Sequence, residues 1–287
     1  MNVFVTGATG NVGQEVIKAL DSSTVEAVIK AGVRNKNKAK DQLAFSSVEL
    51  VNFDFNKPEG FEVAISDNEV LFLLRPPQIS DINSSIKPII DIAKRKNLKH
   101  IIFLSVQGVE DNTFIPHYKI EQLIIESKIP YTFLRPAYFM QNFTTTLHYE
   151  LKHNKRIFLP AGNAKFSLID VSDIGIVTAN ILMNLSEHQY KSYPLTTSKN
   201  MTFQEMADVI SLKTGITVNY KSPNLLEFMW VKYKQQMPFA MILVMIMLHY
   251  LPRFRKAPEI TECVGNITGR KPFSFEDFIE QHKSKLF

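Results

Sequence analysis

The chain has 287 residues, of which 45% are hydrophobic and 21% are charged, as expected for a globular protein with one large α/β domain or one domain and a small lobe. The net charge of +5 is spread along the sequence without a recognisable nucleic-acid-binding module, so we expect no nucleic-acid partner. The single cysteine, Cys263, excludes an internal disulfide. None of the scattered histidines forms a His-x-x-x-His pair with a nearby carboxylate, so we expect no metal site.

The first predicted strand starts within two residues of Met1, which leaves no room for a signal peptide and favours a cytoplasmic protein. The most apolar stretch is 238-PFAMILVMIMLHYLP-252. It is shorter than the roughly 20 residues that a membrane-spanning helix needs, so we expect no membrane partner. Its length suits a buried helix or a subunit contact, and we favour a buried helix. We expect the protein to be a monomer or a homodimer.

Strands and helices alternate along the first half of the chain. Helical spacing of apolar residues predicts helices at 11–20, 80–97 and 116–127, with a polar helix near 36–44. This alternation indicates an α/β fold with a doubly wound parallel sheet, which binds ligands beyond the carboxyl ends of its strands. Apolar runs predict the strands at 2–6, 25–34, 47–55, 69–74, 99–105 and 130–136.

The second half has a less regular pattern. We expect it to complete the sheet and to add a small, mostly helical lobe over the carboxyl edge, with a substrate held in a cleft between the two. The lobe interleaves with the sheet, and no clean linker separates them. Short strands are predicted near 157–160, 166–170 and 191–197, and helices near 171–186, 202–214, 223–250 and 274–284.

Three glycines, Gly7, Gly10 and Gly13, follow the first strand at intervals of three residues and open the first helix. Glycine allows a sharp turn and a close approach of the backbone to a ligand. The helix start adds free N–H groups and the positive end of the helix dipole, so a pyrophosphate is the expected occupant. In this strand–loop–helix context the glycines predict a Rossmann-like dinucleotide site. We therefore interpret residues 1–156 as mainly the dinucleotide-binding domain and residues 157–287 as the part that adds the lobe.

The end of the second strand indicates which dinucleotide is preferred. An acidic residue there holds the adenosine ribose of NAD, whereas a cation suits the 2′-phosphate of NADP. The sequence has 33-VRNKNKAK-40, with Arg34 at the strand end, so we expect NADP, as NADPH, to be preferred and NAD to be possible. Asp54, after the third strand, either contacts the adenine edge or caps the next turn.

Several motifs resemble the NmrA-like family of atypical short-chain dehydrogenases/reductases: VTGATGNVG, LLRPP at 73–77, 130-PYTFLRPAYFMQNF-143 and 268-TGRKPFSFEDFIEQH-282. The family includes NAD(P)H-dependent quinone and azo reductases and regulators that bind the dinucleotide without turning it over. Its bacterial members are often labelled nucleoside-diphosphate-sugar epimerases. The resemblance implies a Rossmann fold with a small C-terminal substrate lobe.

The same resemblance implies roles for individual positions. The phosphate loop corresponds to Gly7, Ala8, Thr9, Gly10, Asn11 and Val12, and the ribose end corresponds to Arg34. Leu73 and Leu74 correspond to the wall beside the cofactor, and Ser105 ends the strand that faces the nicotinamide. The segment that flanks the nicotinamide and the substrate contains Pro136, Tyr138 and Phe139.

The chain departs from the dehydrogenase pattern at the acid–base residues. Short-chain dehydrogenases usually place a Lys four residues after the catalytic Tyr, but here Tyr118 is followed at that distance by Gln122. The position that is Lys in isoflavone-reductase-like relatives falls on His117, which is a candidate proton donor, a ribose contact or a solvated helix residue. Tyr118 is the second catalytic candidate.

Together these observations predict an NAD(P)H-dependent reductase of a small planar acceptor such as a quinone. Such acceptors take hydride readily, and their protons can come from water, whereas sugar epimerisation needs a base at a hydroxyl group. An epimerase is therefore the least favoured reading. The alternative is a non-catalytic NAD(P)-binding redox sensor that acts through a regulatory protein partner.

Overall fold

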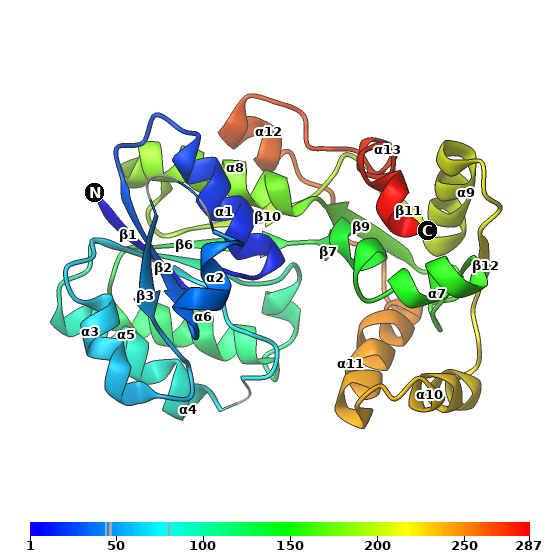
Figure 1. Cartoon of the computed structure of the whole chain (residues 1–287), viewed down its shortest axis with the longest axis horizontal. Helices are drawn as coiled ribbons and strands as arrows, with labels where there is room; N and C mark the ends of the chain where they lie inside the picture. Colours follow the sequence, from blue (N-terminus) through cyan, green and yellow to red (C-terminus); the bar gives the residue numbers. More distant parts are fainter. Residues whose placement is uncertain (44, 46–47, 80) are drawn as a thin grey trace. The chain divides into compact units, whose positions relative to one another are not determined.

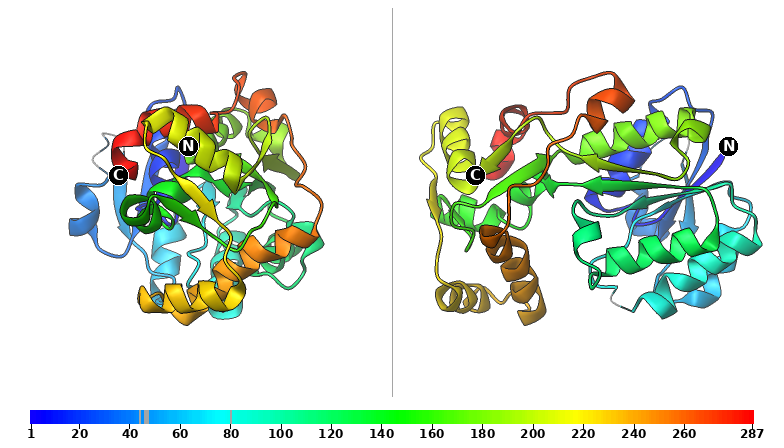
Figure 2. Two further views of the ribbon diagram at one scale, coloured as in Figure 1. Left: turned by 90° about the vertical axis from the view of Figure 1, so that its right-hand side faces the viewer. Right: turned by 180° about the vertical axis from the view of Figure 1, so that it is seen from behind.

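The computed structural model describes residues 1–43, 45, 48–79 and 81–287. The chain forms two compact units, each built from separate segments of sequence. The first, here called the sheet unit, consists of residues 1–137, 171–195 and 262–271. The second unit consists of residues 138–170, 196–261 and 272–287. The chain is shown in Figures 1 and 2, and the two units are described separately.

A seven-stranded sheet forms the centre of the sheet unit, with strand order β10-β6-β5-β4-β1-β2-β3. Every neighbouring pair is parallel; for example, Val3 lies opposite both Ile29 and Val70. This is the predicted doubly wound α/β sheet, and a strand from the second half of the sequence completes it beside β6. The strands are β1 (Asn2–Val5), β2 (Val28–Val33), β3 (Val48–Asn52), β4 (Val70–Leu73), β5 (His100–Leu104), β6 (Tyr131–Pro136) and β10 (Lys191–Leu195).

Helices cover both faces of this sheet, as Figure 1 shows. On one face α3, α5 and α6 bury a continuous apolar cluster with Phe4, Leu71, Phe103 and other inward side chains of the strands. The helices and 3₁₀ turns of the unit are α1 (Asn11–Asp21), α2 (Lys36–Lys40), η1 (Pro58–Gly60), α3 (Phe61–Ile65), α4 (Ile82–Ser85), α5 (Lys87–Arg95), η2 (Val109–Asp111), α6 (Pro116–Ser127), α8 (Val171–Met183), η4 (Leu185–His188) and α12 (Cys263–Thr268).

On the other face α1 packs directly against α8. A Cβ atom at Gly175 of α8 would lie 2.4 Å from the backbone oxygen of Glu15 in α1, so this glycine lets the two helix backbones approach. Asp173, in the first turn of α8, is fully buried and pairs with Arg270. The segment 262–271 is thereby tied to α8.

Several predicted elements differ in detail from the structure, two of them in the sheet unit as follows. The helix expected at 80–97 is divided into α4 and α5, because Pro88 in the first turn of α5 lacks the N–H that a continuous helix would need there. The second strand begins at Val28 rather than at residue 25. Residues 44, 47 and 80, at the ends of three predicted elements, lie outside the described residues.

The second unit surrounds its own apolar core, which includes Phe143, Phe158, Phe203, Phe228 and Phe278. A three-stranded sheet of order β11-β9-β7 and a pair β12-β8 line this core. Its elements are β7 (Tyr138–Phe139), η3 (Met140–Thr144), α7 (His148–Asn154), β8 (Arg156–Phe158), β9 (Lys165–Ile169), β11 (Asn200–Thr202), α9 (Phe203–Thr214), β12 (Asn219–Lys221), α10 (Leu225–Lys234), α11 (Phe239–Tyr250), η5 (Leu251–Phe254) and α13 (Phe275–Leu286).

The expectation of a buried helix at 238–252 is wrong. Pro238 ends the predicted 223–250 helix, so α10 and α11 are separate. In α11 only Ile242, Met245 and His249 are buried, whereas Leu243 and Leu248 are about half exposed. One face of the helix closes the core of the second unit, and the apolar side chains of the other face stay about half exposed among the described residues. Among the described residues, no helix has the length and apolarity to cross a bilayer.

Candidate functional site

The carboxyl ends of the sheet unit's strands define one edge, because all neighbouring strands are parallel. The strand order reverses direction between β1 and β4: β2 and β3 continue on one side, and β5, β6 and β10 on the other. At such a switch point the two connecting loops diverge and leave a crevice for a ligand. The loops after β1 and β4 are therefore the core of the candidate site.

The glycine loop after β1 is closely packed on the start of α1. A Cβ atom at Gly13 would lie 2.3 Å from the carbonyl oxygen of Gly7, so no side chain fits there. Gly7 has a φ of +62°, which favours glycine. Gly10 is the N-cap of α1 and provides no capping side chain, and the first turn of the helix contains no acidic residue. Thr9, Gly10 and Asn11 are exposed, whereas Ala8 and Val12 are buried.

Leu73 and Leu74, expected to form a wall beside the cofactor, lie at the end of β4 and directly after it. The Leu74 side chain is the nearest group to Gly7, 2.7 Å from the position of a Cβ there. The hydroxyl of Thr6 joins the two strand ends, because it accepts a hydrogen bond from the Leu74 N–H (2.8 Å) and donates to the Leu74 carbonyl (3.1 Å). Leu73 itself is fully buried in the sheet, so only Leu74 borders the glycine loop.

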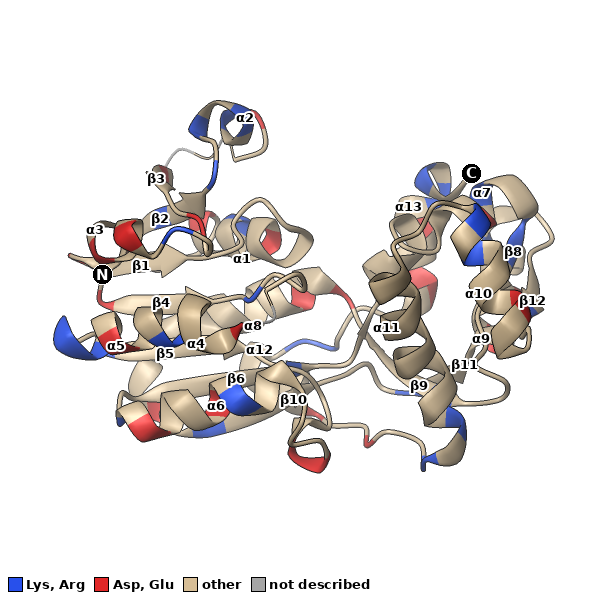
Figure 3. Cartoon of the chain, turned by 90° about the horizontal axis from the view of Figure 1, so that it is seen from below, with Lys and Arg blue, Asp and Glu red and all other residues tan. Residues whose placement is uncertain are grey.

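The predicted ribose end lies after β2. Arg34 is exposed directly beyond the strand, and Asn35 caps α2 by accepting a hydrogen bond from the Lys38 N–H (3.1 Å). Lys36, Lys38 and Lys40 of α2 are also exposed, which makes this corner basic (Figure 3). Asp54, after β3, accepts a hydrogen bond from the Asn56 N–H (3.0 Å) and so caps the next turn.

Ser105 follows β5 and is 2% exposed. Its N–H donates to the Leu134 carbonyl (2.7 Å), but its hydroxyl has no hydrogen-bond partner in the part of the chain that the structure describes. A buried hydroxyl without a hydrogen-bond partner is costly. Because Ser105 lies at the carboxyl edge of the sheet, a polar group of a bound ligand can supply this hydrogen bond. The resemblance to the NmrA-like family implied Ser105 as the residue at the strand end that faces the nicotinamide.

The segment expected to flank the nicotinamide is divided between the two units. Pro136 ends β6 in the sheet unit, whereas Tyr138 and Phe139 form β7 of the second unit. The Tyr138 hydroxyl donates to His249 Nε2 (3.2 Å), because His249 Nδ1 donates to the Met245 carbonyl (2.7 Å). Burial raises the pKa of Tyr138 and lowers that of His249 to about 4, so this pair is neutral and anchors β7 to α11.

His117 lies in the first turn of α6 and stacks on Phe103 of β5, with ring centroids 6.1 Å apart. Burial, followed by the positive charge of Arg75, lowers the pKa of His117 to about 4. The imidazole is therefore neutral near pH 7. It could hydrogen-bond a ligand there, but it is a poor general acid because its charged form is scarcely populated.

Arg75 is a further candidate site residue that sequence reasoning passed over, although it lies within the quoted LLRPP motif. Its Nη1 donates to the carbonyls of Pro76 (3.0 Å), Pro77 (3.2 Å) and Ile79 (2.6 Å). These bonds fold the loop after β4 around the guanidinium group. Its Nε is buried and has no hydrogen-bond partner among the described residues. A charged residue directly after a buried strand at the switch point was the signal that could have identified it.

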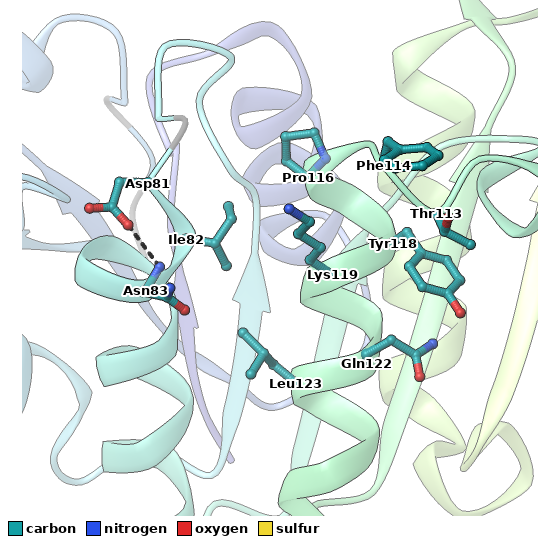
Figure 4. Close-up of a pocket in the computed structure, with 10 residues that line it drawn as sticks. All are labelled: Asp81, Ile82, Asn83, Thr113, Phe114, Pro116, Tyr118, Lys119, Gln122 and Leu123. Carbon is teal, nitrogen blue, oxygen red and sulfur yellow. Dashed lines mark hydrogen bonds between the residues drawn. The ribbon is translucent and has the colours of Figure 1, made fainter.

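Tyr118 does not share the surroundings of His117. It lines a cavity of about 390 Å³ between α4 and the start of α6, together with residues such as Asp81, Lys119 and Gln122 (Figure 4). Neither His117 nor any residue of the glycine loop is among the residues that line this cavity. The two catalytic candidates are therefore neighbours in sequence but face different environments. Among the described residues, no group of three metal-binding side chains is found.

The similarity of the chain to known proteins agrees with this geometry. The sequence matches the NmrA-like family over residues 1–265. It is 28% identical over 285 residues to prestalk A differentiation protein A of Dictyostelium discoideum, covering 98% of this chain and 92% of that protein. It is 25% identical over 284 residues to the NAD(P)H azoreductase of Xenophilus azovorans, covering 98% and 97%.

A similar solved structure is that of the NADPH-dependent quinone oxidoreductase of Escherichia coli in complex with NADPH. It superposes with a TM-score of 0.86 at 20% identity and covers 97% of this chain and 99% of that one, which shows a shared fold. A family match over nine-tenths of the sequence, together with the parallel sheet and the glycine loop, identifies this chain as a member of the NmrA-like family.

Proposed function

We propose that this protein binds NADPH at the carboxyl edge of the sheet unit and reduces a small planar acceptor such as a quinone. The observation that carries the proposal is the glycine loop, in which the Gly7 backbone lies so close to Gly13 that no side chain fits at Gly13, while the positive φ of Gly7 disfavours a side chain there. Such packing leaves the uncapped start of α1 accessible to a pyrophosphate. The unpartnered Ser105 hydroxyl at the same edge also fits a bound dinucleotide.

Each predicted residue has a specific part in this proposal. The N–H groups at the start of α1 hold the pyrophosphate, while Leu74 limits the space beside Gly7. Arg34 pairs with the 2′-phosphate, which distinguishes NADPH from NADH. Ser105 and the neutral His117 hydrogen-bond the nicotinamide end. Tyr138 and Phe139 remain predicted flanking residues.

The bound dinucleotide supplies the hydride, and the protein supplies its orientation. A neutral His117 is a weak acid, and Tyr118 has no lysine at the usual spacing. An acceptor that takes hydride first and its proton from water suits this site best, and quinones and azo compounds behave in this way. The names of the azoreductase and quinone oxidoreductase relatives support this choice.

The lack of a strong proton donor also favours a second candidate, a sensor that binds NAD(P) and signals through a protein partner. A relative named for a role in differentiation is compatible with it. A sensor must present different contacts to its partner in its two states, whereas a reductase must consume NADPH.

Turnover separates the two candidates. Purified protein should oxidise NADPH, followed by its absorbance, in the presence of a panel of quinones and azo dyes. Calorimetric titration with NADPH and NADH measures binding in the same preparation. Binding without turnover across the panel would favour the sensor, and the absence of both binding and turnover would reject both candidates.

A further inference from the structure

The α11 helix of the second unit has an outward apolar stripe that the core does not use. Its inner residues, Ile242, Met245 and His249, are buried in the unit's core. The opposite side exposes residues one turn apart, with exposed fractions between 41% and 51% for each. These residues are Leu243, Val244, Met247, Leu248 and Leu251. Exposed apolar side chains gathered on one face of a helix are a candidate interaction surface.

The preceding helix, α10, adds a second stripe. Leu226, Trp230 and Tyr233 lie on one face of α10, because they are three or four residues apart. They are 76%, 60% and 71% exposed. The α10 and α11 helices pack against each other. Trp and Tyr have an apolar ring with a polar group, which suits them to the boundary between water and lipid. The α10–α11 surface, as we call residues 225–256, is therefore both apolar and rich in aromatic residues.

Most charges on this surface are positive. Residues 225–256 contain five Lys or Arg and one acidic residue, Glu227, which pairs with Lys221 outside the surface. Lys232 is buried and paired with Glu150, but Lys234, Arg253, Arg255 and Lys256 are exposed. Figure 3 shows α11 itself free of charged segments. An uncharged apolar stripe followed by a basic cluster is complementary to an anionic lipid surface, which offers phosphate groups above an apolar interior.

We propose that the α10–α11 surface docks the protein on the surface of an anionic lipid bilayer. A second copy of this chain would bring the same excess of positive charge to the contact, whereas an anionic bilayer supplies the opposite charge. The proposal revises the expectation of no membrane partner, which rested on the length of the apolar stretch alone.

The geometry limits how deep the contact is. The α11 helix has 12 residues and so is about 18 Å long, shorter than the roughly 30 Å hydrocarbon core. Its inner face holds Ile242 and Met245 in the protein core, so the helix lies along the membrane surface and does not enter it end first. The outward side chains reach the acyl boundary while the basic cluster meets the headgroups.

Vesicle sedimentation of the full-length protein tests the proposal. The protein should sediment with phosphatidylcholine vesicles that contain phosphatidylglycerol, sediment much less with phosphatidylcholine alone, and be released by added salt. Trp230 is the single tryptophan, so its emission should shift to shorter wavelength when anionic vesicles are added. This readout needs neither NADPH nor an acceptor, so it can fail or succeed independently of the proposed reductase activity.

Two pairs of variants localise the contact. The double variant Leu243→Asp, Leu248→Asp should lower the partition coefficient by about tenfold or more, whereas Leu212→Asp, at a position 83% exposed on α9, should leave it unchanged. The triple variant Arg253→Glu, Arg255→Glu, Lys256→Glu should abolish the preference for anionic vesicles. The same charge change at three exposed lysines elsewhere, Lys57, Lys94 and Lys285, should not. Circular dichroism confirms that each variant is folded.

Three outcomes would overturn the proposal. The first is no sedimentation with either kind of vesicle. The second is sedimentation that both the Leu243→Asp, Leu248→Asp variant and the Arg253→Glu, Arg255→Glu, Lys256→Glu variant leave intact. The third is a dimer in sedimentation equilibrium, without lipid, that the Leu243→Asp, Leu248→Asp variant dissociates; this would assign the surface to a contact between copies of the chain.

Discussion

Replacing Gly13 with alanine should damage both the stability of the sheet unit and its binding of NADPH. The new Cβ would lie 2.3 Å from the Gly7 carbonyl oxygen, whereas ordinary contacts begin at 3.4 Å, so loop and helix must separate by about 1 Å. The atoms that it meets belong to backbone and cannot rotate away. Overpacking of this kind costs about 1–3 kcal/mol, which lowers Tm by roughly 2–10 °C.

The same displacement should weaken NADPH binding, because a shift of about 1 Å moves the loop's N–H groups outside hydrogen-bond distance of the phosphates. Losing one charge-assisted hydrogen bond costs about 1.5–3 kcal/mol, so Kd should rise at least tenfold. Thermal unfolding and calorimetric titration with NADPH measure the two effects in the same preparation.

Two further glycines serve as controls for this experiment. Gly175→Ala places a Cβ 2.4 Å from the backbone of α1 but away from the loop, so it should lower Tm and change Kd little. Gly60→Ala meets nothing within 4 Å and should change neither. If Gly13→Ala lowers Tm as Gly175→Ala does but binds NADPH normally, the loop does not hold the phosphates. If Gly13→Ala leaves both quantities unchanged, the close packing itself is wrong.

Three other predictions concern charge. Arg34→Asp should raise Kd for NADPH about tenfold or more and change Kd for NADH little, as measured by titration, with Lys94→Asp as the control; equal losses for both cofactors would contradict a 2′-phosphate contact. Because the pKa of His117 is lowered to about 4, kcat/KM for a quinone should show no inflection near pH 6.5, and an inflection there that His117→Gln removes would contradict the neutral imidazole. Hydrogen bonds from Arg156 and Gln235 outweigh the effect of burial and lower the pKa of Glu150 from 4.5 to about 2. The ionised Glu150 side chain therefore adds on the order of 3 kcal/mol to the free energy of unfolding above pH 4.5, and this contribution is lost as the pH falls towards 2. The difference in unfolding free energy between the native protein and Glu150→Gln should shrink over that pH range, and a constant difference would argue against this ionised, buried carboxylate.

Local pattern was sufficient for the elements that carry the cofactor proposal. The helix predicted at 116–127 has those bounds in the structure, because Pro116 can start a helix and its apolar residues follow the helical period. The glycine loop was predicted between β1 and α1, and the loops that carry Arg34, Leu74 and Ser105 were predicted at strand ends. These residues lie at one edge of the sheet because the strands are parallel. Chain direction and the period of the apolar residues are properties of the sequence itself. The sequence was therefore sufficient to predict these elements and the loops that follow them.

Burial and protonation depended on residues that are distant in sequence, and only the tertiary structure decided them. The apolar composition of α11 indicated a buried helix, but the core of the second unit covers only the face with Ile242 and Met245. The neutral state of His117 follows from burial and from the charge of Arg75, which lies more than forty positions away in sequence. A sequence specifies which faces can be buried, whereas the number of neighbours that arrive to cover them is a property of the whole fold.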